Sequence, residues 1–379
     1  MNKKLLALVM AVMMVVLSAC GAPAPSTSGE EPGTPGEAAA SGALKAIAKE
    51  DIVAGFLYVG PIGDEGYSYA HDLGRKALEA EGIQTKYVEN VPENADCEKA
   101  IRDLIDQGCN VIFSTSFGHM DWTLEVAKDH PEVYFSHATG YKTAENMNTY
   151  FGRMYEIRYL SGIAAGLKTK TNKIGYVAAM PISEVVRGLN AFALGVKSVN
   201  PEATVEVLWT NTWYDPALEK QTALELLGKG CDVLGQHCDT AAPIIAAQEK
   251  GAYAIGYNAP GLSAGKDAYL TAALWDWKVY YLDTIQQIID GTWKGEKVWM
   301  PISTGICYLD ELSPNVAEGT EAAIEEAKQK FEADSLFPFA GPLKDNTGKE
   351  VVAAGAKMTD DEVWNMMWLV DNVIGSVPQ

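Results

Sequence analysis

The sequence is short of positive charge. It carries 30 lysines and arginines against 50 aspartates and glutamates, which gives a formal net charge of −20. The phosphates of a nucleic acid would be repelled by such a chain, so the charge argues against nucleic-acid binding. The hydrophobic fraction of 47% is ordinary for a folded protein, and 379 residues are enough to bury a real core.

The sequence also lacks several common catalytic signatures. The motifs HExxH and GxxxxGK(S/T) and the EF-hand loop do not occur. His119 and Asp121 lie two residues apart, as do His237 and Asp239, but neither pair reaches the ligand number of a known metal site. With no nucleophile paired to a base in the sequence, we expect no enzyme, no metal and no cofactor.

Paired cysteines are not evident either. Beyond Cys20 there are five cysteines, so at least one thiol stays unpaired, and no CxxC motif occurs: Cys97, Cys109, Cys231, Cys238 and Cys307. We expect buried free thiols. A bridge between Cys97 and Cys109 stays open, because the sequence does not show whether the fold brings them together.

The one long apolar run, Leu5 to Leu17, is short for a bilayer span. Lys3 and Lys4 precede it, and Leu17-Ser18-Ala19-Cys20 ends it. This segment resembles the lipobox of bacterial lipoproteins. It predicts a signal peptide over residues 1–20, lipidation of Cys20, and a protein anchored to the cell membrane on its extracytoplasmic side.

A flexible tether is predicted next, over residues 21–48, which are rich in Pro, Gly, Ser and Ala and contain no aromatic residue. No later segment has 18 uninterrupted apolar residues. We therefore expect the remainder of the chain to lie outside the membrane.

Strand and helix patterns alternate from residue 51 onward. Residues 52–59 form a β-rich run, and residues 67–82 place apolar side chains on one helical face. Such alternation predicts a parallel sheet covered by helices. The segment 104–138 is echoed by 226–259, which predicts two lobes on one plan; chance similarity between generic βα units is the alternative.

A ligand is expected beyond the carboxyl ends of the parallel strands. Six segments lie there: 63–69, 116–122, 180–184, 211–215, 237–239 and 257–261. Aromatic side chains interleave with carboxylates in them, which suits a flat or sugar-like ligand that carries hydrogen-bond donors. Any single aromatic could instead close a lobe edge.

Three glycines recur after the first strand, at Gly60, Gly63 and Gly66. Their spacing is not GxGxxG, and Asp64 and Glu65 stand where a phosphate would need positive potential. We therefore expect a tight turn at the mouth of the first lobe and not a nucleotide loop.

Four segments resemble the basic membrane protein family of ABC-importer substrate-binding lipoproteins, whose members include purine nucleoside receptors: 60–79, 115–121, 211–243 and 270–281. The resemblance implies a type I periplasmic-binding-protein fold, an α/β fold of two Rossmann-like lobes with parallel sheets joined by a three-segment hinge.

The hinge segments implied by the resemblance lie near residues 151–159, 275 and 302–305. Lobe 1 would comprise residues 51–157 plus about 275–300. Lobe 2 would comprise residues 158–274 plus about 301–377. The C-terminal portion would carry a hairpin at 339–352 and a last helix at 360–374.

The chain departs from the nucleoside-binding members at three places. Those members carry Phe-Asn where this chain has Tyr67-Ser68-Tyr69, an Asp-rich turn where it has Asn258-Ala259-Pro260, and a lysine where it has Trp275. In the family these residues largely serve the ribose. The resemblance therefore favours an adenine-like purine base, with a purine nucleoside as the alternative.

The resemblance and the strand ends together suggest ten ligand-binding residues: Tyr67, Tyr69, Phe117, Asp121, Asn211, Trp213, His237, Asp239, Asp276 and Trp277. Aromatic rings from both lobes would stack on the base, carboxylates would accept its N–H groups, and the lobes would close by hinge motion. The implied partner is a membrane permease, and the protein is expected to be a monomer. A sensor that presents the loaded lobes to a membrane receptor is a further alternative.

Overall fold

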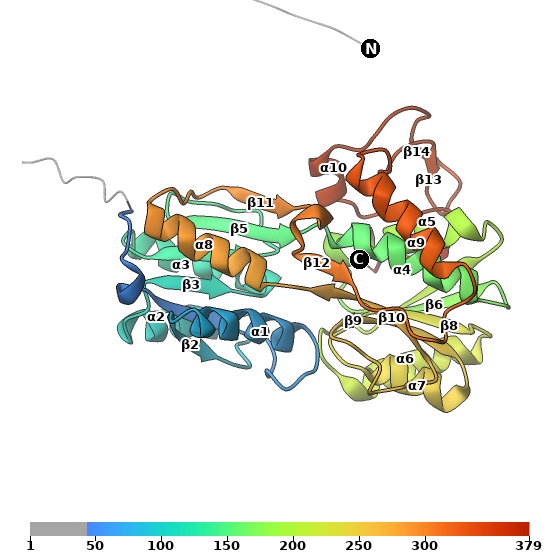
Figure 1. Cartoon of the computed structure of the whole chain (residues 1–379), viewed down its shortest axis with the longest axis horizontal. Helices are drawn as coiled ribbons and strands as arrows, with labels where there is room; N and C mark the ends of the chain where they lie inside the picture. Colours follow the sequence, from blue (N-terminus) through green and yellow to red (C-terminus); the bar gives the residue numbers. More distant parts are fainter. Residues whose placement is uncertain (1–43, 379) are drawn as a thin grey trace, which may run out of the picture. The chain divides into compact units, whose positions relative to one another are not determined.

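Two sheets organise residues 44–378, the part of the chain that this computed structural model describes (Figure 1). We call each sheet with its covering helices lobe 1 and lobe 2; the exact predicted lobe boundaries stay predictions. The predicted signal peptide, Cys20 and most of the tether lie outside the described residues. Within 44–378, no helix is long and apolar enough to cross a membrane.

Lobe 1 is built on six strands in the order β11-β5-β4-β3-β1-β2, and every neighbouring pair is parallel. Its strands are β1 (Val53–Leu57), β2 (Gln84–Val88), β3 (Val111–Ser114), β4 (Tyr134–Ala138), β5 (Met147–Gly152) and β11 (Lys297–Met300). The central strands are buried on both faces, as their continuous apolar runs predict.

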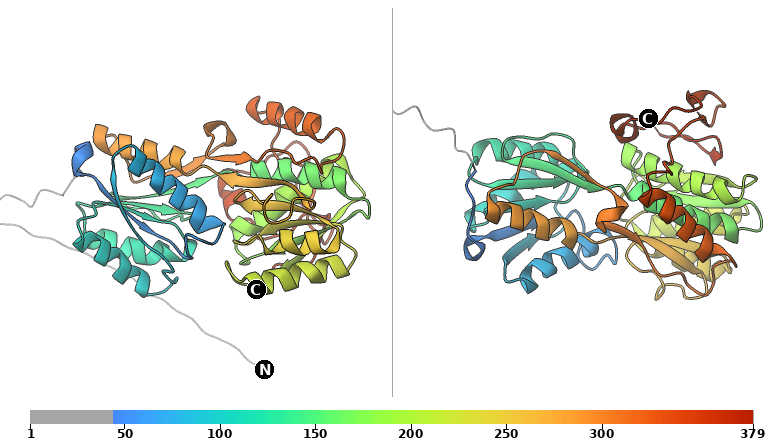
Figure 2. Two further views of the ribbon diagram at one scale, coloured as in Figure 1. Left: turned by 60° about the horizontal axis from the view of Figure 1, so that its bottom comes forward. Right: turned by 45° about the horizontal axis from the view of Figure 1, so that its top comes forward.

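Four helices cover the two faces of this sheet: α1 (Tyr67–Ala80) and α8 (Lys278–Asp290) on one, α2 (Asp96–Asp106) and α3 (Met120–Asp129) on the other (Figure 2). The strand predicted at 52–59 and the helix predicted at 67–82 are thereby confirmed as β1 and α1, with small shifts at their ends.

Lobe 2 has seven strands in the order β12-β10-β9-β8-β6-β7-β15, and β12 alone runs antiparallel to its neighbour. Its strands are β6 (Lys173–Ala178), β7 (Thr204–Trp209), β8 (Val233–His237), β9 (Tyr253–Asn258), β10 (Tyr269–Trp275), β12 (Cys307–Leu309) and β15 (Val373–Ile374).

Helices α4 (Met154–Lys168) and α5 (Ser183–Val199) pack against each other on one face of this sheet, while α6 (Pro216–Gly228) and α7 (Ala242–Lys250) cover the other (Figure 2). Glycine permits the close α4–α5 approach, because a Cβ at Gly162 would lie 2.1 Å from the carbonyl oxygen of Phe192. Helix α9 (Thr320–Glu332) packs on α4.

The chain passes between the sheets three times, after β5, after β10 and after β11. The second passage is packed by aromatic rings. Trp275 and Trp277 stack with centroids 4.3 Å apart, and Trp277 stacks on His71 at 4.2 Å.

The internal repeat is also visible in the fold. Strands β3 and β4 are parallel neighbours in lobe 1, and β8 and β9 are their counterparts in lobe 2. Cys109 and Cys231 are both buried, as expected for packing residues. The five cysteines within the described range are all buried free thiols, so Cys97 and Cys109 are not bridged.

The predicted last helix at 360–374 is wrong beyond its first turn. Helix α10 covers Asp360–Trp364 only. Strand β15 then joins the edge of the lobe 2 sheet beside β7. A capping box at Thr359 starts the helix, but Asn190 of α5 holds the following segment by bonding the N–H of Val370 and the carbonyl of Trp368. These tertiary bonds override the helical pattern. The predicted hairpin is confirmed as β13 (Leu343–Lys344) and β14 (Glu350–Val352).

Candidate functional site

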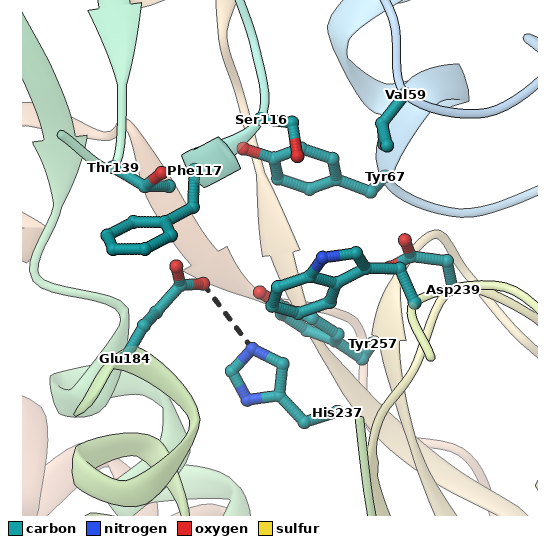
Figure 3. A pocket seen from close by; sticks show the side chains of 10 residues that line it. Val59, Tyr67, Ser116, Phe117, Thr139, Glu184, His237, Asp239 and Tyr257 are labelled. Carbon is teal, nitrogen blue, oxygen red and sulfur yellow. Dashed lines mark ion pairs between the residues drawn. The ribbon is translucent and has the colours of Figure 1, made fainter. Parts of the chain in front are cut away.

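A pocket lies where loops from both lobes meet at the carboxyl ends of their strands (Figure 3). It encloses about 330 Å³ of space between atoms, solvent at its mouth included. Lobe 1 supplies five lining residues and lobe 2 supplies five: Val59, Tyr67, Ser116, Phe117, Thr139, Glu184, Trp213, His237, Asp239 and Tyr257. Its place is the one that parallel-sheet topology predicts for a ligand.

The turn after β1 is organised by Asp64. One carboxylate oxygen, Oδ1, accepts the backbone N–H groups of Gly66 and Tyr69 at 2.7 and 3.0 Å, and Oδ2 accepts that of Ser68 at 2.9 Å. These are the N–H groups that would hold a phosphate at the start of α1. The protein's own carboxylate occupies them, which agrees with the expectation that this is not a nucleotide loop.

Gly66 brings the two lobes into contact beside the pocket. A Cβ at this position would lie 2.1 Å from the backbone carbonyl oxygen of Asp239. No side chain fits at such a distance, so glycine is required for the turn of lobe 1 to meet the Asp239 loop of lobe 2 in this closed arrangement.

Tyr67 begins α1 and presents its ring to the pocket. Its hydroxyl donates to the carbonyl of Thr115 at 2.7 Å, and its ring meets His71 edge to face at 4.4 Å. Burial raises the pKa of Tyr67 well above its usual value. The hydroxyl therefore stays protonated and the ring is held in one orientation.

Asp239 lies on the loop after β8 and is almost fully buried. Asn258 donates to its Oδ1 at 2.9 Å and is the only hydrogen-bond partner of the carboxylate among residues 44–378. Burial raises the pKa of Asp239 well above its usual value, and the nearby carboxylates of Asp64, Glu219 and Glu184 raise it further. Asp239 thus needs a donor from a ligand or a proton of its own.

The loop that carries Asp239 is fixed from α6. Thr240 donates to Glu219 at 2.5 Å, and Glu219 also accepts the N–H of Asp215, which caps the helix. The N–H of Asp239 donates to the carbonyl of Trp213 at 3.1 Å. These bonds fix the positions of Asp239 and Trp213, two pocket residues from different loops, relative to each other.

His237 ends β8 and faces Glu184 from the first turn of α5 (Figure 3). Its Nε2 lies 3.4 Å from Oε1 of Glu184, longer than an ordinary hydrogen bond. Burial, and then the charge of Arg158, lower the pKa of His237 to about 4. The imidazole is therefore neutral near pH 7. Arg158 itself covers the ring of Tyr257 at 3.7 Å and keeps that aromatic wall in place.

Five of the ten sequence-predicted residues line this pocket: Tyr67, Phe117, Trp213, His237 and Asp239. Their role in binding a ligand stays a prediction. What the structure adds is that it brings them together from both lobes.

The other five do not line it. Tyr69 lies half-buried one position past Ser68 on α1, and Asn211 is exposed. Asp121 is exposed and pairs with Lys142 at 2.6 Å, while Asp276 pairs with Lys278 at 2.8 Å. Trp277 is 1% exposed inside the aromatic column of the second passage.

Five lining residues were not among the ten: Val59, Ser116, Thr139, Glu184 and Tyr257. Ser116, Glu184 and Tyr257 belong to segments that the sequence places at strand ends. The usable signal was this position at a strand end, but the sequence does not tell which way each side chain points.

Comparison with known families settles what kind of protein this is. The family model described as ABC transporter substrate-binding protein PnrA-like matches residues 52–336. The chain belongs to this family. The predicted family is therefore confirmed.

Two relatives of this PnrA-like chain are similar over most of their length. A purine-binding protein of Brucella abortus (strain 2308) is 40% identical over 88% of this chain and 96% of its own. A Haloferax volcanii (strain DS2) protein that carries the name of an ABC transporter glucose-binding protein is 39% identical over 87% of this chain and 82% of its own.

The fold also has solved counterparts. A solute-binding protein of an ABC transporter system from Aeropyrum pernix K1 superposes with a TM-score of 0.67 at 20% identity, over 78% of this chain and 93% of that one. The PnrA-like chain therefore has the type I periplasmic-binding-protein fold, as predicted.

Proposed function

We propose that this substrate-binding protein of an ABC transporter binds an adenine-like purine base in the pocket between its lobes. One observation carries the proposal: aromatic side chains from both lobes and two carboxylates, Glu184 and Asp239, line a single pocket at the strand ends. The similarity to a purine-binding relative supports it.

The aromatic residues would hold the flat faces of the base. Tyr67 and Phe117 come from lobe 1, and Trp213 and Tyr257 come from lobe 2. Stacking of a base on an aromatic ring contributes about 1–3 kcal/mol. Rings supplied by both lobes make binding and lobe closure one event.

The polar groups would read the edge of the base. Asp239 has one donor, from Asn258, and three carboxylates nearby that disfavour its charge. An amino or ring N–H of the ligand would stabilise the charged form, which favours a ligand rich in donors. Neutral His237 can donate one ring N–H and accept at the other nitrogen.

Two other ligand classes are candidates, each because of a specific observation. The purine nucleoside is the alternative from the family resemblance. A hexose is a candidate because the relative named for glucose is nearly as similar as the purine-binding one. Sugars also lie on aromatic rings, so the aromatic lining of the pocket suits a hexose as well as a purine. A sensor role would use the same pocket.

The family consists of substrate-binding proteins of transporters, which argues for delivery of an unchanged ligand and against turnover. Such a protein works outside the cytoplasm. We further propose that lipidated Cys20 anchors it, that residues 21–48 tether it, and that the closed, loaded lobes meet a permease.

Calorimetry tests the ligand directly. The chain from residue 44 would be titrated with adenine, guanine, hypoxanthine, adenosine and glucose, and we expect the strongest binding with adenine. Mass spectrometry of the ligand that co-purifies is an independent readout. Clear binding of glucose with no heat from any purine would overturn the proposal but not the family.

A further inference from the structure

Thr139 differs from the other residues that line the pocket because its backbone is strained. It directly follows β4 and has a φ angle of 65°. In this left-handed region Cβ crowds the backbone, and a side chain that is branched at Cβ is an outlier there. Strained residues of this kind concentrate at ligand sites, where the surrounding structure holds them in place.

Three contacts hold this strained turn. The N–H of Thr139 donates to the carbonyl of Tyr150 at 3.0 Å. The next residue is Gly140, where a Cβ would lie 2.2 Å from Nδ1 of His137, so the turn packs closely against that ring. Nε2 of His137 in turn donates to the carbonyl of Ser116 at 2.8 Å. Since Ser116 also lines the pocket, these contacts fix Thr139 relative to the rest of the lobe 1 wall.

The side chain of Thr139 has a second unfavourable feature. It is 5% exposed and lines the pocket, yet its hydroxyl has no hydrogen-bond partner within residues 44–378. The other hydroxyl groups of the lining, those of Tyr67, Ser116 and Tyr257, each have a partner in the protein. A buried polar group without a partner lowers stability. Two unfavourable features in one residue of the pocket indicate a role in binding the ligand.

This hydroxyl complements the carboxylates of the pocket. Glu184 and Asp239, which also line it, accept hydrogen bonds when they are ionised. A purine base has N–H groups for them, but it also has ring nitrogens that accept. Thr139 can donate to one of these nitrogens, because its proton is not committed to a protein oxygen. Figure 3 shows Thr139 and Asp239 at opposite ends of the lining, so the two residues would hold opposite edges of the base.

We propose that Thr139 is a ligand-binding residue whose hydroxyl donates a hydrogen bond to a ring nitrogen of the base. The strained turn after β4 places this hydroxyl in the lobe 1 wall of the pocket. An analogue with a C–H group in place of that nitrogen is rejected, because the buried hydroxyl then stays unpaired. This inference rests on the proposed function, and it adds to the same site a residue that distinguishes purines by their ring nitrogens.

Thr139→Ser and Thr139→Ala form a matched pair for calorimetry on the chain from residue 44. Both relieve the crowding of the branch, and only serine keeps the hydroxyl. Adenine should bind Thr139→Ala about fivefold or more weakly than Thr139→Ser, a loss typical of leaving a buried group unpaired. In the empty protein, the alanine variant should be at least as stable to denaturant as the serine variant, because the hydroxyl has no protein partner. A purely structural role of the hydroxyl predicts the reverse order of stability.

Deazaadenines, in which a C–H group replaces one ring nitrogen at a time, identify the atom that accepts the hydrogen bond. We expect one of them to bind the wild type about fivefold or more weakly than adenine does. The same analogue should bind Thr139→Ala as tightly as adenine does, to within about twofold, because the donor is gone.

Thr123→Val is the matched control in lobe 1. The Thr123 hydroxyl is buried outside the pocket lining, 2.8 Å from the hydroxyl of Ser114 and 2.8 Å from the carbonyl oxygen of His119. Its removal should lower the stability of the protein and leave the affinity for adenine unchanged. This is the opposite of the pattern expected at Thr139.

The outcomes are distinct. No heat with adenine from the wild type would end the proposed function itself. Adenine binding that is equal to within about twofold in the folded serine and alanine variants would overturn the role of Thr139 alone. A wild type that binds every deazaadenine as tightly as adenine would overturn it too. If the alanine variant does not fold, Thr139→Val decides in its place, because it lacks the hydroxyl but keeps the size and the branch of threonine.

Discussion

Asp239 shows how a single residue ties stability to function. Its carboxyl is buried, has one neutral donor, and faces three other carboxylates. A group whose folded-state pKa is raised favours the folded state most at low pH, and this contribution is lost as the pH rises through the folded pKa. In the empty protein near pH 7, the charge on Asp239 therefore opposes folding.

Asp239→Asn should consequently stabilise the empty protein and weaken ligand binding. At pH 7 we expect a gain of about 1–3 kcal/mol in the free energy of unfolding, since a poorly partnered buried group is removed. The gain should shrink as the pH falls below 3.8, the ordinary pKa of an aspartate, because the wild-type carboxyl is then protonated in both states. Denaturant titrations at several pH values measure the first effect, and calorimetry the second, for which we expect a loss of about tenfold or more.

The matched control is Asp121→Asn, because Asp121 is exposed and paired with Lys142 outside the pocket. We expect its ligand affinity to equal that of the wild type. Equal effects of the two substitutions on binding would contradict the role given to Asp239.

Trp213 is the second single residue that the proposal singles out, since it is the aromatic contribution of the loop after β7. Trp213→Ala should weaken purine binding by about 1–3 kcal/mol if its ring stacks on the base. Trp213→Phe should recover part of the loss because a ring remains. An affinity within about twofold of the wild type for Trp213→Ala would show that the ring does not stack.

At the scale of elements, the turn before α1 and the passages between the sheets decide whether the lobes can meet. The turn is fixed by Asp64, and it touches lobe 2 through a glycine. The passages are tied together by Glu156 in the first turn of α4, which accepts the N–H of Ile302 at 2.8 Å.

Gly66→Ala should impair closure of the two lobes, although residue 66 does not line the ligand pocket. The added methyl would meet the carbonyl of Asp239 at 2.1 Å, so the closed arrangement must open locally. Calorimetry should show an affinity loss of about tenfold or more. Gly63→Ala is the matched control, because a Cβ there has no atom within 4 Å. A similar loss of affinity in both variants would show that the conformation of the turn before α1 matters, and not the contact between Gly66 and Asp239.

Glu156 should make the passages between the sheets sensitive to pH. Burial raises its pKa to about 7 from 4.5. The stability that Glu156 contributes is therefore complete below pH 4.5 and is lost as the pH rises through about 7. Glu156→Gln should raise the free energy of unfolding at pH 8 by on the order of 1–3 kcal/mol and change it little at pH 4.5. Thermal melts across this pH range test whether Glu156→Gln stabilises the protein more at pH 8 than at pH 4.5. An equal effect at both pH values would show that Glu156 does not titrate in this range.

At the scale of the whole molecule, the proposed function adds two features to the lobes: the predicted anchor at Cys20 and the proposed presentation of the closed, loaded form to a permease. The predicted anchor lies outside the described residues, so its test is independent of the pocket. Cys20→Ser in the full-length protein expressed in bacteria should move it from the membrane fraction to the soluble fraction. Ligand affinity should not change, and continued membrane association would refute the anchor.

The sequence by itself determined the α/β alternation, the duplicated plan of the lobes and the strand ends where a ligand would bind. Those features follow from local patterns: apolar periodicity, turn residues and the repeat of 104–138 in 226–259. The family resemblance extended this to the passages between the sheets. The sequence also identified five residues that share the pocket.

Tertiary structure alone decided which side chains enter the pocket. Trp277 and Phe117 look alike as aromatics near strand ends, yet Trp277 is buried in the second passage and Phe117 faces the pocket. Asp121 and Asp239 both follow a histidine by two residues, yet one pairs with Lys142 in solvent and the other is buried among carboxylates. The reason is physical: orientation depends on contacts between residues far apart in the chain, which no local pattern records.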